Sequence, residues 1–289
     1  MTTRALVLTA VASILADVLA KEFLGFVPGW LTVTKILILI GAAVYYTREG
    51  SFHLAKYAVV LIALVAFPHL SVFVGRTSVW QSMFMLQTFT GYFGSMVLLK
   101  FLSTIPLIVL LLVIFKSPKA VYLVKGDLSV KAEPIKWLGI HPNWVTWRRL
   151  SILSALAISG GTLLLTLITV TGFRAPETLS SLPNYIPAIL LLALINSLSE
   201  GFMFRNAILG SLRGLLPKDH VLLIAAAFFG MAHFYGAPSG IVGVLMSGLL
   251  GWFMSRSMYE TGGLLSSWII HFMQDVVIFA TLFLLGEFI

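Results

Sequence analysis

Charged residues are scarce in this chain, and that scarcity excludes a water-soluble globule. Only 10% of the 289 residues are Asp, Glu, Lys or Arg, whereas 59% are hydrophobic and the mean hydropathy is +1.00. A soluble domain of ordinary composition has about 25% charged residues. So few charges do not cover a surface that faces water. The composition therefore predicts a protein that lies within a lipid bilayer.

Cysteine is absent altogether. Its absence excludes a thiol nucleophile, disulfide bonds and a zinc site built from thiolates. The strand-type alternation of polar and apolar residues is lacking too, so the spans are expected to be α-helices, which satisfy their own backbone hydrogen bonds in lipid. The net charge of +8 does not indicate nucleic acid as a partner, because Lys and Arg of membrane proteins collect in cytoplasmic loops.

Long apolar runs are abundant, and they predict an all-α fold, a polytopic transmembrane helix bundle of about eight to nine spans. About 20 apolar residues cross a hydrocarbon core of roughly 30 Å. Nine runs qualify as candidates, and the sixth is long enough to tilt or break. They cover residues 5–20, 31–46, 57–75, 92–115, 151–171, 185–212, 221–235, 240–256 and 264–286.

The positive charges predict the orientation of the bundle. The longest polar connection, 116–149, carries seven cations: Lys116, Lys119, Lys125, Lys131, Lys136, Arg148 and Arg149. We therefore expect it to be cytoplasmic. Counting spans from it places most other loop cations on the same side and leaves Lys21, Arg76 and Arg174 outside. This count predicts a multi-pass protein of the cell membrane, with its N-terminus in the cytoplasm and its C-terminus outside.

The same connection divides the chain into three parts. Residues 1–115 are a four-span region to which the sequence assigns no role, and 116–149 are a basic cytoplasmic loop. Residues 150–289 are a five-span bundle that holds nearly all the chemistry.

Ionisable side chains within the spans are functional hypotheses by default, since burying them in lipid is unfavourable. There are nine of them: Asp17, Lys35, His69, Lys100, Glu200, Arg205, His233, His271 and Asp275. The first four lie alone or near the ends of different spans, so we interpret them as snorkelling or helix-pairing groups. The other five fall in ordered patterns in the C-terminal part.

Three patterns carry these five residues. They are Glu200 to Arg205, Phe229 to His233, and His271 to Asp275. Residues four apart share a helix face, as in the second and third patterns. At 1.5 Å per residue, the carboxylate and both imidazoles lie roughly 20–27 Å from the cytoplasmic turns. Three helices are thus expected to bring these groups to a similar depth.

A carboxylate beside an imidazole is able to deprotonate a water molecule. A second His with an Asp on its face is able to stabilise an oxyanion, if the Asp is protonated or only orients the His. Other interpretations stay open at this point. Glu200, His233 and His271 are also a valid zinc ligand set. Polar groups on facing helices also suit a proton or ion pathway, or a structural polar core.

Taken together, the three patterns resemble the motifs of the CAAX protease and bacteriocin-processing family, the glutamic intramembrane endopeptidases that include the Ras-converting CAAX protease. That family shows Glu-Glu-x-x-x-Arg, then Phe-x-x-x-His, then His-x-x-x-Asn or Asp, on successive membrane helices. The resemblance covers roughly residues 150–286. It implies an intramembrane peptidase that uses a Glu/His-activated water and needs no metal or other cofactor.

The resemblance also implies roles for single residues. Glu200 would activate the water and His233 would share it. His271 and Asp275 would stabilise the oxyanion. Arg205 and Phe229 would support the site. The implied partners are the lipid bilayer and a membrane protein or lipidated peptide as substrate. The alternative is a non-catalytic polar-cored protein, either a transporter or a degenerate family member that acts as a partner or immunity factor.

One position departs from the family pattern. Gly201 stands where the motif has its second Glu, which would lie four residues before Arg205 on the same helix face. Glu200 lies five residues before Arg205, about 140° away around an α-helix. Because an unpaired guanidinium in lipid is unfavourable, we expect Arg205 to lie near the cytoplasmic interface or to pair with another acid such as Glu260.

Overall fold

The computed structural model describes residues 1–84, 87–169, 176–236 and 238–286. Within these ranges the chain is helical, and its only extended pairings are isolated bridges. The elements in chain order are α1 (Thr2–Ala12), α2 (Leu15–Leu24), α3 (Gly29–Arg48), α4 (Phe52–Gly75), α5 (Ser78–Met83), α6 (Phe89–Phe115), the 3₁₀ turn η1 (Lys136–Leu138), α7 (Trp147–Thr169), α8 (Pro176–Gly201), the π-helical segment η2 (Phe202–Asn206), α9 (Ala207–Leu212), α10 (Lys218–Ala232), α11 (Gly240–Thr261) and α12 (Leu265–Leu285).

Eight helical segments in the described ranges are long and apolar enough to cross a membrane, which confirms the predicted fold class. They are Thr2–Leu24, Gly29–Arg48, Phe52–Gly75, Phe89–Phe115, Trp147–Ile168, Leu179–Leu212, Gly240–Thr261 and Leu265–Leu285. The run at 221–235 corresponds to α10, which has 15 residues and ends at Ala232. It is shorter than the ~20 residues of a full crossing. The end of the expected span 151–171 and Arg174 lie outside the described residues.

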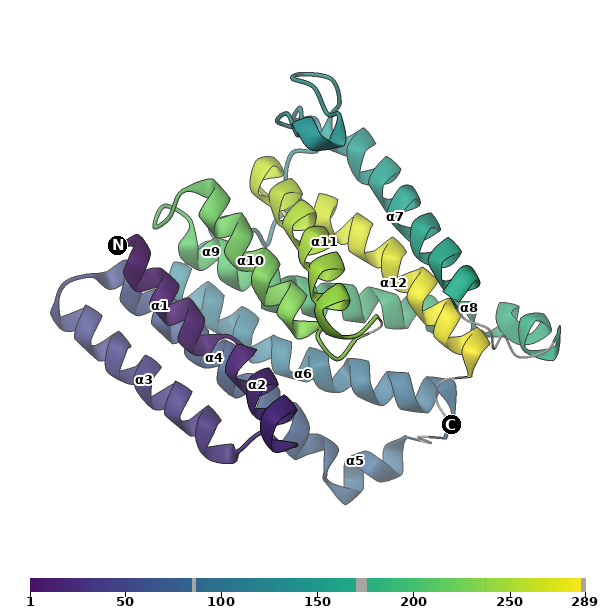
Figure 1. Ribbon diagram of the computed structural model, residues 1–289, viewed down its shortest axis with the longest axis horizontal. Coiled ribbons are helices and arrows are strands. Elements are labelled where there is room, and N and C mark those ends of the chain that lie inside the picture. Colours follow the sequence, from purple (N-terminus) through teal and green to yellow (C-terminus); the bar gives the residue numbers. More distant parts are fainter. Residues whose placement is uncertain (85–86, 170–175, 237, 287–289) are drawn as a thin grey trace.

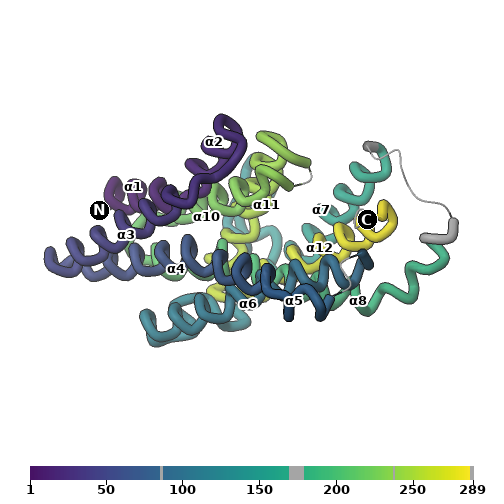
Figure 2. Tube along the Cα trace, turned by 90° about the horizontal axis from the view of Figure 1, so that it is seen from below, coloured from purple at the N-terminus to yellow at the C-terminus, as the bar shows by residue number. Residues whose placement is uncertain are grey.

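The bundle has two parts that α6 connects. Figures 1 and 2 show α1, α3 and α4 on one side, α7 and α12 towards the other, and α10 and α11 between them. Helix α6 packs against α4 from the first group and against α8 from the second. Helix α12 packs between α8 and α7, and α10 pairs with α11. A residue on α6 is therefore able to reach the C-terminal helices.

Small residues allow α10 and α11 to approach closely. A Cβ atom on Gly230 would lie 2.5 Å from the carbonyl oxygen of Val244, and one on Gly251 would lie 2.9 Å from the Phe229 side chain. Neither distance is tolerable for a real side chain, so glycine is required for this spacing. The close contact fixes Phe229 and, one turn later, His233 against the rest of the bundle.

The long connection between α6 and α7 is held to α11 by Glu260. Its Oε2 accepts hydrogen bonds from Trp147 Nε1 at 2.8 Å and from the backbone N–H of Glu133 at 3.0 Å. Its Oε1 forms ion pairs with Lys218 Nζ and Arg256 Nε, both at 2.8 Å. The side chain of Glu260 is 3% exposed, and its partners other than Arg256, which lies on α11 itself, tie α11 to the connection or to a neighbouring helix.

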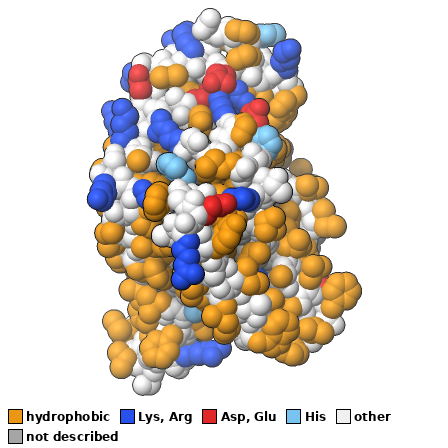
Figure 3. All heavy atoms as spheres, turned by 90° about the vertical axis from the view of Figure 1, so that its left-hand side faces the viewer, with side chains coloured by type: hydrophobic (Ala, Val, Ile, Leu, Met, Phe, Trp, Pro, Cys, Tyr) orange, Lys and Arg blue, Asp and Glu red, His pale blue; other side chains and the backbone are white. Residues whose placement is uncertain are grey.

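Lys and Arg side chains gather on one face of the molecule (Figure 3). This is the left-hand end in Figure 1, where the N-terminus, the α3–α4 turn and the α9–α10 connection lie. The C-terminal end of α12 lies at the opposite end.

The first span is broken at residue 13, and an ion pair accompanies the break. Lys35 Nζ on α3 donates to the backbone carbonyl of Ser13 at 2.8 Å and contacts Asp17 Oδ2 at 2.5 Å. Asp17 and Lys35 are therefore helix-pairing groups, one of the two interpretations that the sequence suggested, and they join the first two spans.

Candidate active site

Glu200 is the centre of a polar cluster inside the bundle. It lies in the last turn of α8, and its side chain is 10% exposed. Its Oε1 contacts Lys100 Nζ at 2.5 Å. Its Oε2 faces two imidazoles, with His271 Nε2 at 3.4 Å and His233 Nε2 at 3.9 Å. The fold thus brings together the carboxylate and the two histidines that the sequence singled out.

His233 directs an unprotonated nitrogen towards Glu200. Its Nδ1 lies 2.7 Å from the backbone carbonyl oxygen of Phe229, which only accepts, so Nδ1 donates. In a neutral imidazole the other nitrogen, Nε2, is then an acceptor. Because Glu200 Oε2 and His233 Nε2 both accept, a proton donor such as a water molecule suits the 3.9 Å between them.

His271 has the opposite tautomer. Arg205 Nη2 lies 2.8 Å from its Nδ1, and a guanidinium only donates, so Nδ1 accepts. The ring proton therefore lies on Nε2, which is 3.4 Å from Glu200 Oε2 and 3.6 Å from Asp275 Oδ1. The site holds one imidazole ready to accept a proton and one ready to donate a hydrogen bond.

Two residues of the cluster were missed by sequence reasoning, Lys100 and Asn196. Lys100 Nζ on α6 donates to Asn196 Oδ1 at 2.7 Å as well as to Glu200. Asn196 Nδ2 donates to Asp275 Oδ2 at 2.9 Å. Asn196 lies four residues before Glu200 on one helix face, which was an available signal. Lys100 was interpreted as an isolated group, and its position beside Glu200 depends on the packing of α6 against α8.

The expectation for Arg205 is wrong in both of its forms. The residue is 1% exposed and lies within the cluster, where its side chain donates to His271. The acid Glu260 is bound elsewhere, by Lys218 and Arg256. The guanidinium also lies over the Phe229 ring, with Cζ 5.3 Å from the ring centroid.

A π-helical turn explains how Arg205 reaches the site. In η2 the N–H of Ala207 donates to the carbonyl of Phe202, five residues earlier. Such a turn brings residues five apart nearly above one another, and π turns are frequent at functional sites. Glu200 and Arg205 are five apart, so the 140° separation expected for an α-helix does not apply to them. Both side chains reach the same imidazole.

Phe229 is the apolar support of both histidines. Its ring centroid lies 4.5 Å from that of His233 and 5.6 Å from that of His271, the latter in an edge-on arrangement. Its position also places it under Arg205. Buried rings of this kind hold neighbouring side chains in single rotamers.

The cluster is reached from one side. The side chains of His271 and Asp275 are 3% and 5% exposed, whereas those of His233 and Lys100 are 31% and 29% exposed. His233 and Lys100 therefore form the more exposed side of the cluster. Among the described residues, no group of three or more His, Asp or Glu side chains has the arrangement of a metal site.

Comparison with known proteins gives one match. Residues 182–277, about a third of the chain, match the family model described as Type II CAAX prenyl endopeptidase Rce1-like. The matched segment contains the six residues of the three sequence patterns, while Lys100 lies outside it. Comparisons with curated proteins and with solved structures gave no match.

Proposed function

We propose that the chain, residues 182–277 of which match the Rce1-like CAAX endopeptidase family model, hydrolyses a peptide bond of a membrane-presented substrate with a water molecule activated by Glu200 and His233. One observation carries the proposal. A carboxylate oxygen and a bare imidazole nitrogen face each other at 3.9 Å, and a donor imidazole lies 3.4 Å from the same carboxylate. Ionisable groups inside a membrane mark functional sites, and this trio has the acceptors and the donor that acid–base catalysis needs.

In the proposed reaction, the water donates its hydrogens towards Glu200 Oε2 and His233 Nε2. One of these groups takes a proton as the water oxygen attacks the carbonyl carbon of the substrate. The resulting tetrahedral intermediate carries a negative oxygen. When the C–N bond breaks, the proton passes to the leaving amine. The immediate products are a carboxylic acid and an amine, a proton then passes from the acid to the amine to give a carboxylate and an ammonium group, and both catalytic groups return to their starting state.

The oxyanion is stabilised, in this proposal, by the Nε2–H of His271. Arg205 is a positioning residue, because its bond to Nδ1 fixes the tautomer that presents this N–H. Asp275 lies 3.6 Å from the same nitrogen and is held by Asn196. As a carboxylate it orients the imidazole and does not itself donate.

Lys100 is a second positioning residue in the proposal. It holds Glu200 Oε1, so that Oε2 points to the histidines. It also places a positive charge beside the carboxylate. Through Lys100, the N-terminal part contributes to a site that otherwise lies in residues 150–289.

The membrane setting defines the substrate class. We propose that the N-terminus and the basic 116–149 connection are cytoplasmic, and that the substrate is a lipidated C-terminal tail, a leader peptide or a helix anchor. The first agrees with the name of the matched family. The four N-terminal spans are then available to present a substrate or bind a partner.

The test uses the full-length protein in lipid vesicles with three peptides: a prenylated C-terminal peptide, its unlipidated form and a leader-type peptide. Mass spectrometry follows the products. We expect cleavage of a membrane-bound peptide, loss of cleavage with Glu200→Ala, and no effect of a chelator. Cleavage that persists with Glu200→Ala contradicts the mechanism. Chelator inhibition that zinc reverses favours a metal held by the same side chains.

A further inference from the structure

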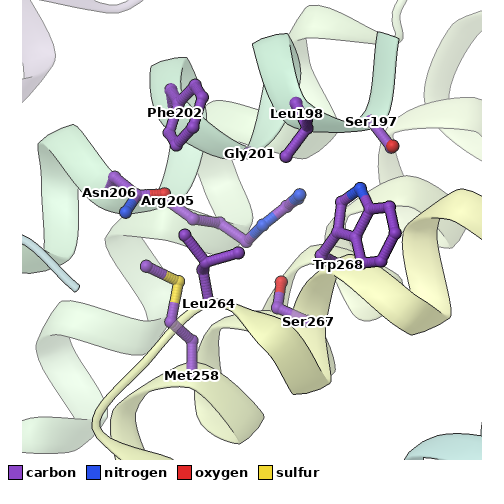
Figure 4. Close-up of a pocket in the computed structure, with 10 residues that line it drawn as sticks. All are labelled: Ser197, Leu198, Gly201, Phe202, Arg205, Asn206, Met258, Leu264, Ser267 and Trp268. Carbon is purple, nitrogen blue, oxygen red and sulfur yellow. The ribbon is translucent and has the colours of Figure 1, made fainter. Parts of the chain in front are cut away.

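A small cavity lies between α8 and α12, beside Arg205. Gly201, Ser267 and Trp268 line it together with the guanidinium, and Leu198 closes its upper side (Figure 4). In the close-up, Arg205 runs across the cavity and its guanidinium ends between Gly201 above and Trp268 and Ser267 beyond it. The space open to the centre of a water-sized sphere is about 10 Å³. This is close to the smallest volume that holds one particle of the size of a water molecule.

Several buried polar atoms around the cavity, most of them donors only, lack a hydrogen-bond partner among the described residues. Arg205 Nε and Nη1 and Trp268 Nε1 are buried and have no hydrogen-bond partner within the described part of the chain, and the same holds for Ser267 Oγ. Arginine and tryptophan nitrogens only donate. A buried donor left unsatisfied is unfavourable. Whatever occupies the cavity must therefore accept hydrogen bonds from several directions.

The charge of Arg205 specifies the occupant further. Its one side-chain hydrogen bond goes to His271 Nδ1, a neutral acceptor. Glu200 and Asp275 act on its guanidinium through space, but neither carboxylate lies within ion-pair distance of it, and Glu200 is already bound by Lys100. A buried guanidinium without an anion in direct contact is unfavourable in lipid.

We propose that this cavity is a binding site for a small monatomic anion, with chloride as the physiological ligand. Arg205 Nε and Nη1 hold the ion, and Trp268 Nε1 and Ser267 Oγ complete its coordination. A monatomic anion accepts from all directions and neutralises the guanidinium, whereas a water molecule accepts about two hydrogen bonds and carries no charge. The ion takes no part in the chemical step itself, and it stabilises Arg205, the residue that orients His271.

Gly201 makes the ion necessary. It lies four residues before Arg205, and a Cβ atom added to it would lie 3.2 Å from Arg205 Nη2. The neighbour is the far end of a flexible side chain, so a larger residue is accommodated by a small shift. A glutamate here would place its own carboxylate at the guanidinium. With glycine, the anion comes from solution.

The first experiment measures thermal unfolding of the full-length protein in detergent by intrinsic tryptophan fluorescence. Chloride replaces gluconate at constant ionic strength. A ligand that binds only the folded state raises the midpoint in a saturable way. We expect a rise of roughly 2–4 °C once chloride is well above its Kd. No rise means that the cavity holds water only, and the proposal is then wrong.

Variants test where the chloride acts. Gly201→Glu should have a raised midpoint in gluconate and no further response to chloride. Arg213→Gln removes a cation that is exposed on the surface, and its chloride response should equal that of the unaltered protein. A response that survives Gly201→Glu, or that disappears with Arg213→Gln, places the ion elsewhere and overturns the proposal.

A second measurement does not depend on any variant. Crystals of the unaltered protein grown in bromide should show an anomalous peak in hydrogen-bond contact with Arg205 Nη1 and Trp268 Nε1. A peak only at other positions, or a water molecule at this one, contradicts the site.

Discussion

Two glutamates lie buried in the C-terminal half of the molecule, and their surroundings differ. Glu260 uses both oxygens: Oε1 pairs with Lys218 and Arg256, and Oε2 accepts two N–H groups, all at 2.8–3.0 Å. Glu200 uses one oxygen, in its 2.5 Å contact with Lys100. Its other oxygen faces His233 and His271 at 3.9 and 3.4 Å, beyond the length of a strong hydrogen bond.

The comparison separates a structural carboxylate from a reactive one. A carboxylate whose acceptor positions are all filled by cations and N–H groups holds helices together and has no lone pair left for a substrate or water. One that is held at a single oxygen is oriented but still able to accept a proton. Burial and charge alone would not have told these two glutamates apart.

The largest effect is expected on the reactive side, from His271→Ala. Removing a donor to an oxyanion lowers kcat by about 10²–10³-fold. We expect this loss with little change in KM, measured with a cleaved peptide in vesicles. His220→Ala, an exposed histidine on α10, serves as the control and should keep full activity. A fall in kcat of less than tenfold in His271→Ala would contradict the proposal that His271 stabilises the oxyanion.

The structural side is tested by Glu260→Ala. Removing one partner of a buried ionic group typically lowers the free energy of unfolding by about 3–5 kcal/mol. We expect a lower thermal midpoint, while kcat per folded molecule stays close to that of the unaltered protein. Glu133→Ala is the matched control, because its side chain is 59% exposed and its ion pairs contribute little. An equal fall of the thermal midpoint in both variants would contradict the structural role of Glu260.

A smaller effect is expected where the two parts of the bundle meet. Lys100→Met should lower kcat roughly tenfold, equivalent to about 1.4 kcal/mol of transition-state stabilisation, because Glu200 loses its fixed orientation. Lys100→Arg should restore part of the activity, which a merely structural lysine would not require. Lys35→Met removes another buried, ion-paired lysine, on α3, and should leave kcat unchanged. If Lys35→Met and Lys100→Met change kcat to the same extent, Lys100 has no role in positioning Glu200.

Much of the fold follows from the apolar runs, because each run long enough to cross a membrane must be a helix. The site was predictable in its motif residues for a similar reason: buried ionisable groups stand out in an apolar sequence. The run at 221–235 shows the limit, since α10 ends at Ala232 and the run does not reveal the turn at His233.

The rest of the site depends on tertiary packing that a pattern does not contain. Lys100 joins Glu200 only because α6 packs against α8. The π turn at 202–206 changes which residues share a helix face. The argument about Arg205 assumed a regular α-helix, so it failed at this turn. Gly201 was recognised as a departure from the motif, but the cavity beside it was not.

The most direct test of the account compares the turnover of Glu200→Gln with that of Glu260→Gln, each normalised to folded protein. Both substitutions remove one charge without changing the shape of the side chain. We expect Glu200→Gln to lower kcat by about 10²–10⁴-fold, the usual contribution of a general base. The kcat of Glu260→Gln should stay close to that of the unaltered protein. Comparable turnover in the two variants would contradict the claim that Glu200 activates the water.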